Sequence, residues 1–129
     1  MSMDALTVIA QSMEEMDINY AFMEWSEEPS YPYFVGEYQE VPSGGESGEQ
    51  ELNFILTGFA RGEGAWIKLE EEKKEIKKHF PPVGGKVVIT DSGSAVAVFY
   101  ANSLPIPQDE MELKKIQINL TVKEWSVEE

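Results

Sequence analysis

Residues 51–80 constrain the fold most, because they combine a strand, a tight glycine turn and a helix in the middle of the chain. Residues 52–59 (LNFILTGF) are rich in apolar and aromatic side chains, which is typical of a half-buried strand. Residues 61–64 (RGEG) interrupt this pattern, and residues 65–79 then consist almost entirely of helix-forming residues. Pro81 and Pro82 end the helix. The segment therefore predicts a strand followed by a helix that packs back across a sheet.

The rest of the chain predicts one further helix and five further strands. Apolar side chains at three- and four-residue spacing predict a helix at residues 3–16. Apolar runs and alternation predict strands at 17–25, 33–41, 86–90, 95–101 and 114–125, the last with the cleanest alternation. Gly36 is a candidate β-bulge, and residues 102–110, which contain Pro105 and Pro107, are expected to form a loop.

The predicted order is therefore helix, three strands, helix, three strands. Short connections and alternating patterns favour an α+β fold, with a mostly antiparallel sheet of five to six strands and both helices packed on one face. With 129 residues the chain has the size of one domain, which we expect to span residues 1–129.

Residues 42–49 (PSGGESGE) form the clearest loop of the chain. They lie between two predicted strands, so the simplest geometry is a long antiparallel hairpin with an exposed, mobile tip. A glycine-rich loop can hold a phosphate group, but this loop has no lysine and precedes a strand instead of a helix. We therefore expect no phosphate site there.

Composition excludes several classes of function. The formal net charge is -14, which disfavours binding to nucleic acid or to anionic membranes. The chain contains no cysteine, so it has no disulfide, thiolate metal site or cysteine nucleophile. It has no apolar run of 18 residues, and its N-terminus lacks the pattern of a signal peptide. The straightforward expectation is a cytosolic protein.

No motif in the sequence indicates catalysis. The one histidine, His79, follows several lysines at the end of the second predicted helix, where basic side chains suit the helix dipole. On that helix Trp66, Leu69 and Ile76 are expected to share one face, and Glu70 is expected to pair with Lys74. We therefore expect no enzyme, no cofactor and no metal, although a site made of carboxylates alone stays open as an alternative.

Aromatic side chains at strand ends or beside loops are the best lead to function. Such side chains are enriched at protein interfaces, although they can also cap the edges of a small core. The candidate interface comprises these aromatic residues, the glycines of the 42–49 loop and an arginine that precedes the second helix: Trp25, Tyr31, Tyr33, Tyr38, Gly44, Gly45, Gly48, Arg61 and Trp125.

Three features give the sequence a family resemblance. Residues 28–35 (EPSYPYFV) lead from an acidic turn into the second strand, a long hairpin follows with the 42–49 tip, and residues 59–62 (FARG) lead into the second helix. In this arrangement the chain resembles tail-terminator or tail-completion (minor tail) proteins of long-tailed bacteriophages and prophages. Families of head-tail joining and minor capsid proteins share the same size and layout.

The resemblance implies a structural protein of virion assembly without enzymatic activity. The expected assembly is a homo-oligomeric ring, commonly a hexamer, that ends the tail tube and joins it to the head-connector proteins. It would assemble in the host cytoplasm and reside in the tail or neck of the virion, with DNA passing through the ring unbound. An acidic lumen would repel DNA phosphates. The alternative from another class is a monomeric acidic adaptor or inhibitor that binds a basic protein.

Overall fold

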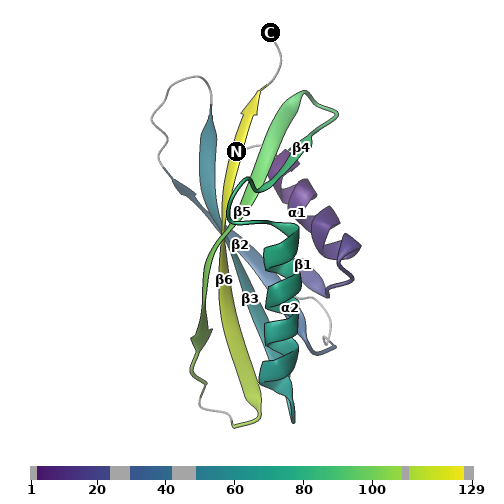
Figure 1. Cartoon of the computed structure of the whole chain (residues 1–129), viewed down its shortest axis with the longest axis vertical. Coiled ribbons are helices and arrows are strands. Elements are labelled where there is room, and N and C mark those ends of the chain that lie inside the picture. The colour runs from purple at the N-terminus through teal and green to yellow at the C-terminus, as the bar shows by residue number, and fades with distance from the viewer. Residues whose placement is uncertain (1–2, 24–29, 42–48, 109–110, 127–129) are drawn as a thin grey trace.

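The computed structural model describes residues 3–23, 30–41, 49–108 and 111–126. They form two helices and six strands in the predicted order (Figure 1). The helices are α1 (Met3–Glu15) and α2 (Ala65–His79); the strands are β1 (Tyr20–Phe22), β2 (Tyr33–Val41), β3 (Gln50–Arg61), β4 (Lys86–Ile89), β5 (Ser94–Ile106) and β6 (Leu113–Ser126). The predicted α+β class and element order are confirmed.

All six strands join one curled sheet in the order β1-β2-β3-β6-β5-β4. Every neighbouring pair is antiparallel except β1 and β2, which run parallel, so the predicted mostly antiparallel sheet is confirmed. At the start of this pair the side-chain amide of Asn19 donates to the carbonyls of Ser30 (3.0 Å) and Pro32 (3.2 Å). These bonds fasten the residues before β2 beside the start of β1.

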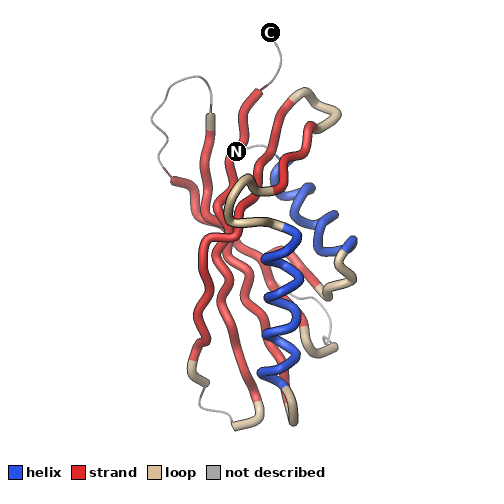
Figure 2. Tube along the Cα trace, in the orientation of Figure 1, coloured by secondary structure: helices blue, strands red, loops and turns tan. Residues whose placement is uncertain are grey.

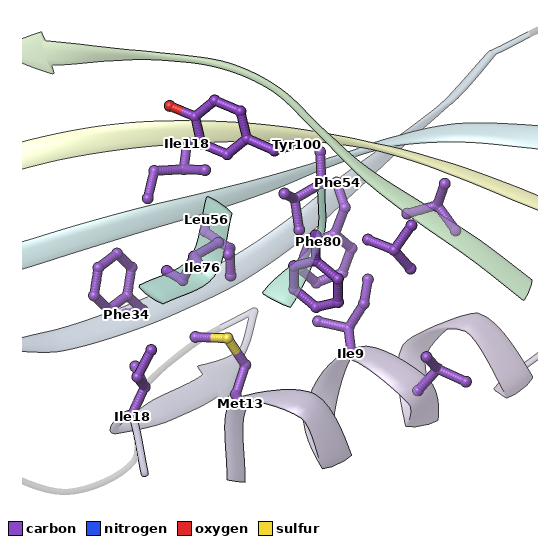
Figure 3. Close-up of a cluster of buried hydrophobic side chains, with 14 of the residues drawn as sticks. Ile9, Met13, Ile18, Phe34, Phe54, Leu56, Ile76, Phe80, Tyr100 and Ile118 are labelled. Atoms are coloured by element: carbon purple, nitrogen blue, oxygen red, sulfur yellow. The ribbon is translucent and has the colours of Figure 1, made fainter. Parts of the chain in front are cut away.

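Both helices lie on one face of the sheet, as predicted (Figure 2). α1 supplies Ile9 and Met13 to the core and α2 supplies Leu69 and Ile76; these side chains are fully buried. They pack against the even-numbered side chains of β3 and β6 together with Phe34 and Phe80 (Figure 3). The strict alternation of apolar and polar residues in β6 predicts that one face of the sheet is buried.

Gly36 is not a bulge. It keeps regular register opposite Leu56, and the register shift of the sheet instead falls between Tyr100 and Asn102 on β5. A Cβ atom at Gly36 would lie 2.7 Å from the ring of Phe54, so glycine is needed there for close packing of an aromatic ring. Gly58 plays the same role beneath the ring of Phe34.

β5 is longer than predicted. The stretch expected to be a loop from residue 102 continues as strand to Ile106, paired with β6 through the bulge. Pro105 is tolerated because β4 pairs only with residues 95–98 of β5, which leaves the outer side of Pro105 without a neighbouring strand among the described residues. Proline was therefore a misleading signal for the end of this strand.

Two details of α2 also differ from expectation. Trp66 is 38 % exposed and does not share the buried face of Leu69 and Ile76. Glu70 pairs with Lys73, at 2.7 Å, instead of Lys74. Neither α1 nor α2 combines the length and apolarity that a membrane-spanning helix requires, and no other described segment is helical over comparable length.

Candidate functional site

The face of the sheet opposite the helices, which we call the open face, is the candidate site. Along β2 and β3 the even-numbered side chains enter the core, and the odd-numbered ones therefore point to the open face. The strand register places Tyr33, Phe59, Lys115 and Ile106 directly side by side across β2, β3, β6 and β5. Four strands thus contribute to one continuous line of side chains.

Five residues at this end of the open face form a stacked group, which we call the aromatic row: Arg61, Tyr31, Tyr33, Phe59 and Lys115. The ring centroids of Tyr31 and Tyr33 lie 5.3 Å apart, and those of Tyr33 and Phe59 lie 4.9 Å apart with an interplanar angle of 20°. The guanidinium carbon of Arg61 lies 5.6 Å from the centre of the Tyr31 ring, and Nζ of Lys115 lies 5.4 Å from that of Phe59. The three rings therefore form a series with a cation at each end, Arg61 beside Tyr31 and Lys115 beside Phe59.

Each contact in the row has a modest energy, and the row as a whole is ordered by several of them. An aromatic pair contributes about 0.5–1.5 kcal/mol beyond area burial, and a cation–π contact at an exposed site about 0.5–1 kcal/mol. Such contacts hold the rings in a fixed geometry before any partner binds. A partner then loses less conformational entropy of the site on binding.

A shallow hollow of about 480 Å³ adjoins the row. Its floor is formed by half-buried side chains of β2 and β3, which include Val35, Ile55 and Thr57. Met23, which is 58 % exposed, lies at one side, and Glu37 and Gln117 add polar groups. The hollow therefore combines apolar and polar side chains in similar measure, so a partner could contact it through both.

The charged side chains are unevenly distributed along the sequence. Residues 1–60 contain twelve Asp and Glu side chains and no Lys or Arg, so every basic side chain comes from residues 61–129. Two of these ten cations, Arg61 and Lys115, end the aromatic row. Partial burial raises the pKa of Tyr33; Tyr31 raises it further and Arg61 lowers it. The Tyr33 phenol is therefore neutral at physiological pH.

The structure brings three of the candidate interface residues together: Tyr31, Tyr33 and Arg61. Tyr38 lies apart, on the helix-covered face, where its ring stacks on Phe22 with centroids 6.1 Å apart. Trp125 is half-buried on the open face opposite Ala95, at the other end of the sheet. The remaining four, Trp25, Gly44, Gly45 and Gly48, lie outside the described residues.

Sequence reasoning missed two members of the row, Phe59 and Lys115. A signal was available in β3, which carries apolar side chains on both faces: Phe54 and Leu56 toward the helices, Ile55 and Phe59 away from them. A strand that is apolar on both sides, in a sheet with helices on one side, indicates a second surface that excludes water. Lys115 could be placed beside Phe59 only once the register was known.

Two polar clusters lie away from the open face. The Asp4 carboxylate accepts hydrogen bonds from the hydroxyls of Ser92, Ser94 (2.7 Å) and Thr90 (3.3 Å), which join the start of α1 to the β4–β5 turn. These bonds, with that of Ser92 first, hold the pKa of Asp4 below its usual value.

His79, at the end of α2, lies with Nε2 3.6 Å from a carboxylate oxygen of Glu15 at the end of α1. Burial lowers the pKa of His79, and Lys86 lowers it further, against the opposing effects of Glu15 and Glu75. The ring is therefore neutral at physiological pH, and its contact with Glu15 is not a full ion pair. Within residues 3–23, 30–41, 49–108 and 111–126, no three acidic, histidine or cysteine side chains gather closely enough to hold a metal ion.

Comparisons with known proteins add no family to this description. Neither a scan against protein-family models nor a search among curated proteins found a match.

Proposed function

We propose that this chain is a structural subunit of a long-tailed bacteriophage or prophage particle, in which it forms a ring that ends the tail tube and joins it to the head connector. The observation that carries the proposal is the aromatic row with its adjoining hollow on the open face. Aromatic side chains clustered at the surface are typical of a face that another protein covers. Aromatic and arginine side chains are also the residue types that contribute most to interface energy.

The distribution of charge supports assembly through contacts between unlike surfaces. The N-terminal sixty residues are purely acidic in their charged side chains, whereas the open face ends in Arg61 and Lys115. A ring with cyclic symmetry joins one surface of each subunit to a different surface of the next, so it can use opposite charges at each contact. The residual negative charge of the assembly keeps it soluble and repels the phosphates of DNA passing through it.

Matched serine variants test the role of the open face. Phe59→Ser removes the ring that lies between Tyr33 and Lys115 in the aromatic row. Ile67→Ser removes an apolar side chain from the exposed side of α2. Mass measurement by light scattering and negative-stain imaging should show rings for the parent chain and for Ile67→Ser, and loss of rings for Phe59→Ser. Equal assembly of all three, with retained folding by circular dichroism, would remove the open face from the proposal.

A monomeric acidic adaptor is the second candidate, and the net charge of -14 favours it. Such a protein would bind a basic partner mainly through charge, so its affinity would fall steeply as ionic strength rises. Ring assembly also buries the aromatic row, so rising salt should weaken it less steeply than it weakens a contact made by charge alone. Titration of salt against the assembled mass separates the two candidates.

A further inference from the structure

The two outer strands of the sheet differ from each other in a way that suits pairing between copies. β4 forms one edge, and its side chains Val87 and Ile89 are 53 % and 62 % exposed. Natural edge strands are normally protected by charge, proline or a bulge, because an unprotected apolar edge recruits another strand. Lys86 is the one charged residue of β4.

The other edge is left half open by β1. β1 covers β2 only at residues 34–36, so among the described residues the stretch from Glu37 to Val41 pairs with β3 on one side and with no strand on the other. This open stretch carries Glu37 and Glu40, whereas β4 carries Lys86. The charges of the two edges are therefore complementary.

Hydrogen bonds show which backbone groups point outward from each edge. Phe34 N–H donates to Asn19, and the Gly36 carbonyl accepts from Met23 N–H at 2.7 Å, so the even-numbered residues of β2 point away from β3. Backbone groups alternate along a strand, and Tyr38 and Glu40 therefore point outward next. On β4, Thr90 N–H donates to Ser94, so Val87 and Ile89 are the residues that point away from β5.

We infer that β4 of one copy pairs in parallel with the open stretch of β2 in the next copy, which continues the sheet from subunit to subunit. The inference rests on the proposed ring. β2 and β4 run in the same direction within one sheet, so copies related by rotation about a ring axis bring the two strands together in parallel. β1 already pairs with β2 in parallel, and β4 of the neighbour takes the position that follows β1.

The space beside β2 also fixes the register of this pairing. Continuation of the β1 register places Met23 beside Glu37, so among the described residues the stretch left for a neighbour begins at Tyr38. Gln39 then lies between the outward groups of Tyr38 and Glu40. Val87 of the neighbour then lies beside Gln39, and Ile89 lies beside Val41. In this register the outward groups of Val87 bond to those of Tyr38 and Glu40, as parallel pairing requires.

A double-cysteine variant tests the pairing, because the chain contains no cysteine of its own. Facing residues of neighbouring strands lie about 4.7–4.9 Å apart, within the Cα separation that a disulfide spans. Gln39→Cys combined with Val87→Cys should therefore give, under mild oxidation, a ladder of covalent oligomers that ends at the ring size and collapses on reduction. Each single variant, and Gln39→Cys combined with Val83→Cys on the exposed α2–β4 turn, should stay monomeric on a denaturing gel.

Other outcomes separate the pairing from the ring itself. Imaging of the same samples before oxidation shows whether rings exist. Rings with no ladder above the Val83→Cys control would overturn the strand pairing and leave the ring in place. Covalent dimers from Val87→Cys alone would show β4 paired with β4, which also overturns it. Absence of both rings and ladder, alone and on isolated tail tubes, would overturn the pairing together with the proposed function.

Discussion

Replacement of Gly58 by alanine offers a sharp test of how the sheet packs under its helices. Gly58 faces Phe34 across β2 and β3, and an added Cβ atom would lie 2.6 Å from Cζ and 2.9 Å from Cδ2 of that ring. Phe34 is fully buried, so its ring has no free space into which to move. Overpacking of this kind costs about 1–3 kcal/mol.

Two opposing contributions set the expected size of the effect. Alanine loses less conformational entropy than glycine on folding, and this offsets about 0.5–1 kcal/mol of the overpacking cost. The net loss in free energy of unfolding should therefore be at most about 2.5 kcal/mol, and about 1.3 kcal/mol at the middle of both ranges. For a chain of this size the middle value corresponds to a fall of roughly 4–6 °C in melting temperature. Urea unfolding followed by circular dichroism measures it.

The Phe34→Leu background supplies the matched control. Leucine leaves more room above residue 58, so Gly58→Ala should be less destabilising there than in the parent chain, with a coupling of about 1 kcal/mol. Unchanged or increased stability of Gly58→Ala in the parent chain would refute the assignment of this space to the Phe34 ring. An equal loss in both backgrounds would show that the backbone, and not the ring, resists the methyl group.

Three further predictions concern the connections between elements. Folding lowers the pKa of His79, so as the pH falls the unfolded chain takes up the proton before the folded chain does. The free energy of unfolding should therefore decrease as the pH falls through about 6.5, the ordinary pKa of histidine. His79→Gln should make the free energy of unfolding less dependent on pH in this range. Folding lowers the pKa of Asp4 as well, so the Asp4 carboxylate stabilises the folded chain above pH 3.8, and this stabilisation is lost as the pH falls below that value. Asp4→Asn should lower the free energy of unfolding at neutral pH and make it less sensitive to acid. Asn19→Ala removes two hydrogen bonds to the chain before β2 and should cost about 1–2 kcal/mol in urea unfolding, whereas Asn53→Ala on the exposed surface should cost almost nothing.

Much of the fold could be predicted from local pattern. The alternation of residues 114–125 identified β6 and its buried face, and the helix formers of residues 65–79 gave α2 with the same bounds as the structure. The parallel pairing of β1 with β2 could not be predicted, because contacts such as those of Asn19 join residues eleven and thirteen positions apart. The continuation of β5 past Pro105 depends on how far β4 extends, which is a property of the sheet and not of residues 102–106.

The candidate site shows the same division. Tyr31, Tyr33 and Arg61 could be selected as interface residues by type and by position near strand ends. Tyr38 has the same residue type as Tyr33 and lies on the same strand, but the odd difference in position sends it to the helix-covered face. Phe59 and Lys115 become neighbours through long-range register alone, so no local pattern could pair them.

The mass of the assembled parent chain tests the central claim most directly. Native mass spectrometry over a range of protein concentrations, with negative-stain imaging of the same samples and of samples mixed with isolated tail tubes, gives both the subunit number and the shape. We predict a closed ring with a central hole, commonly of six copies, in solution or at the end of the tube. A monomeric mass at every concentration, with tube ends left bare, would contradict the account.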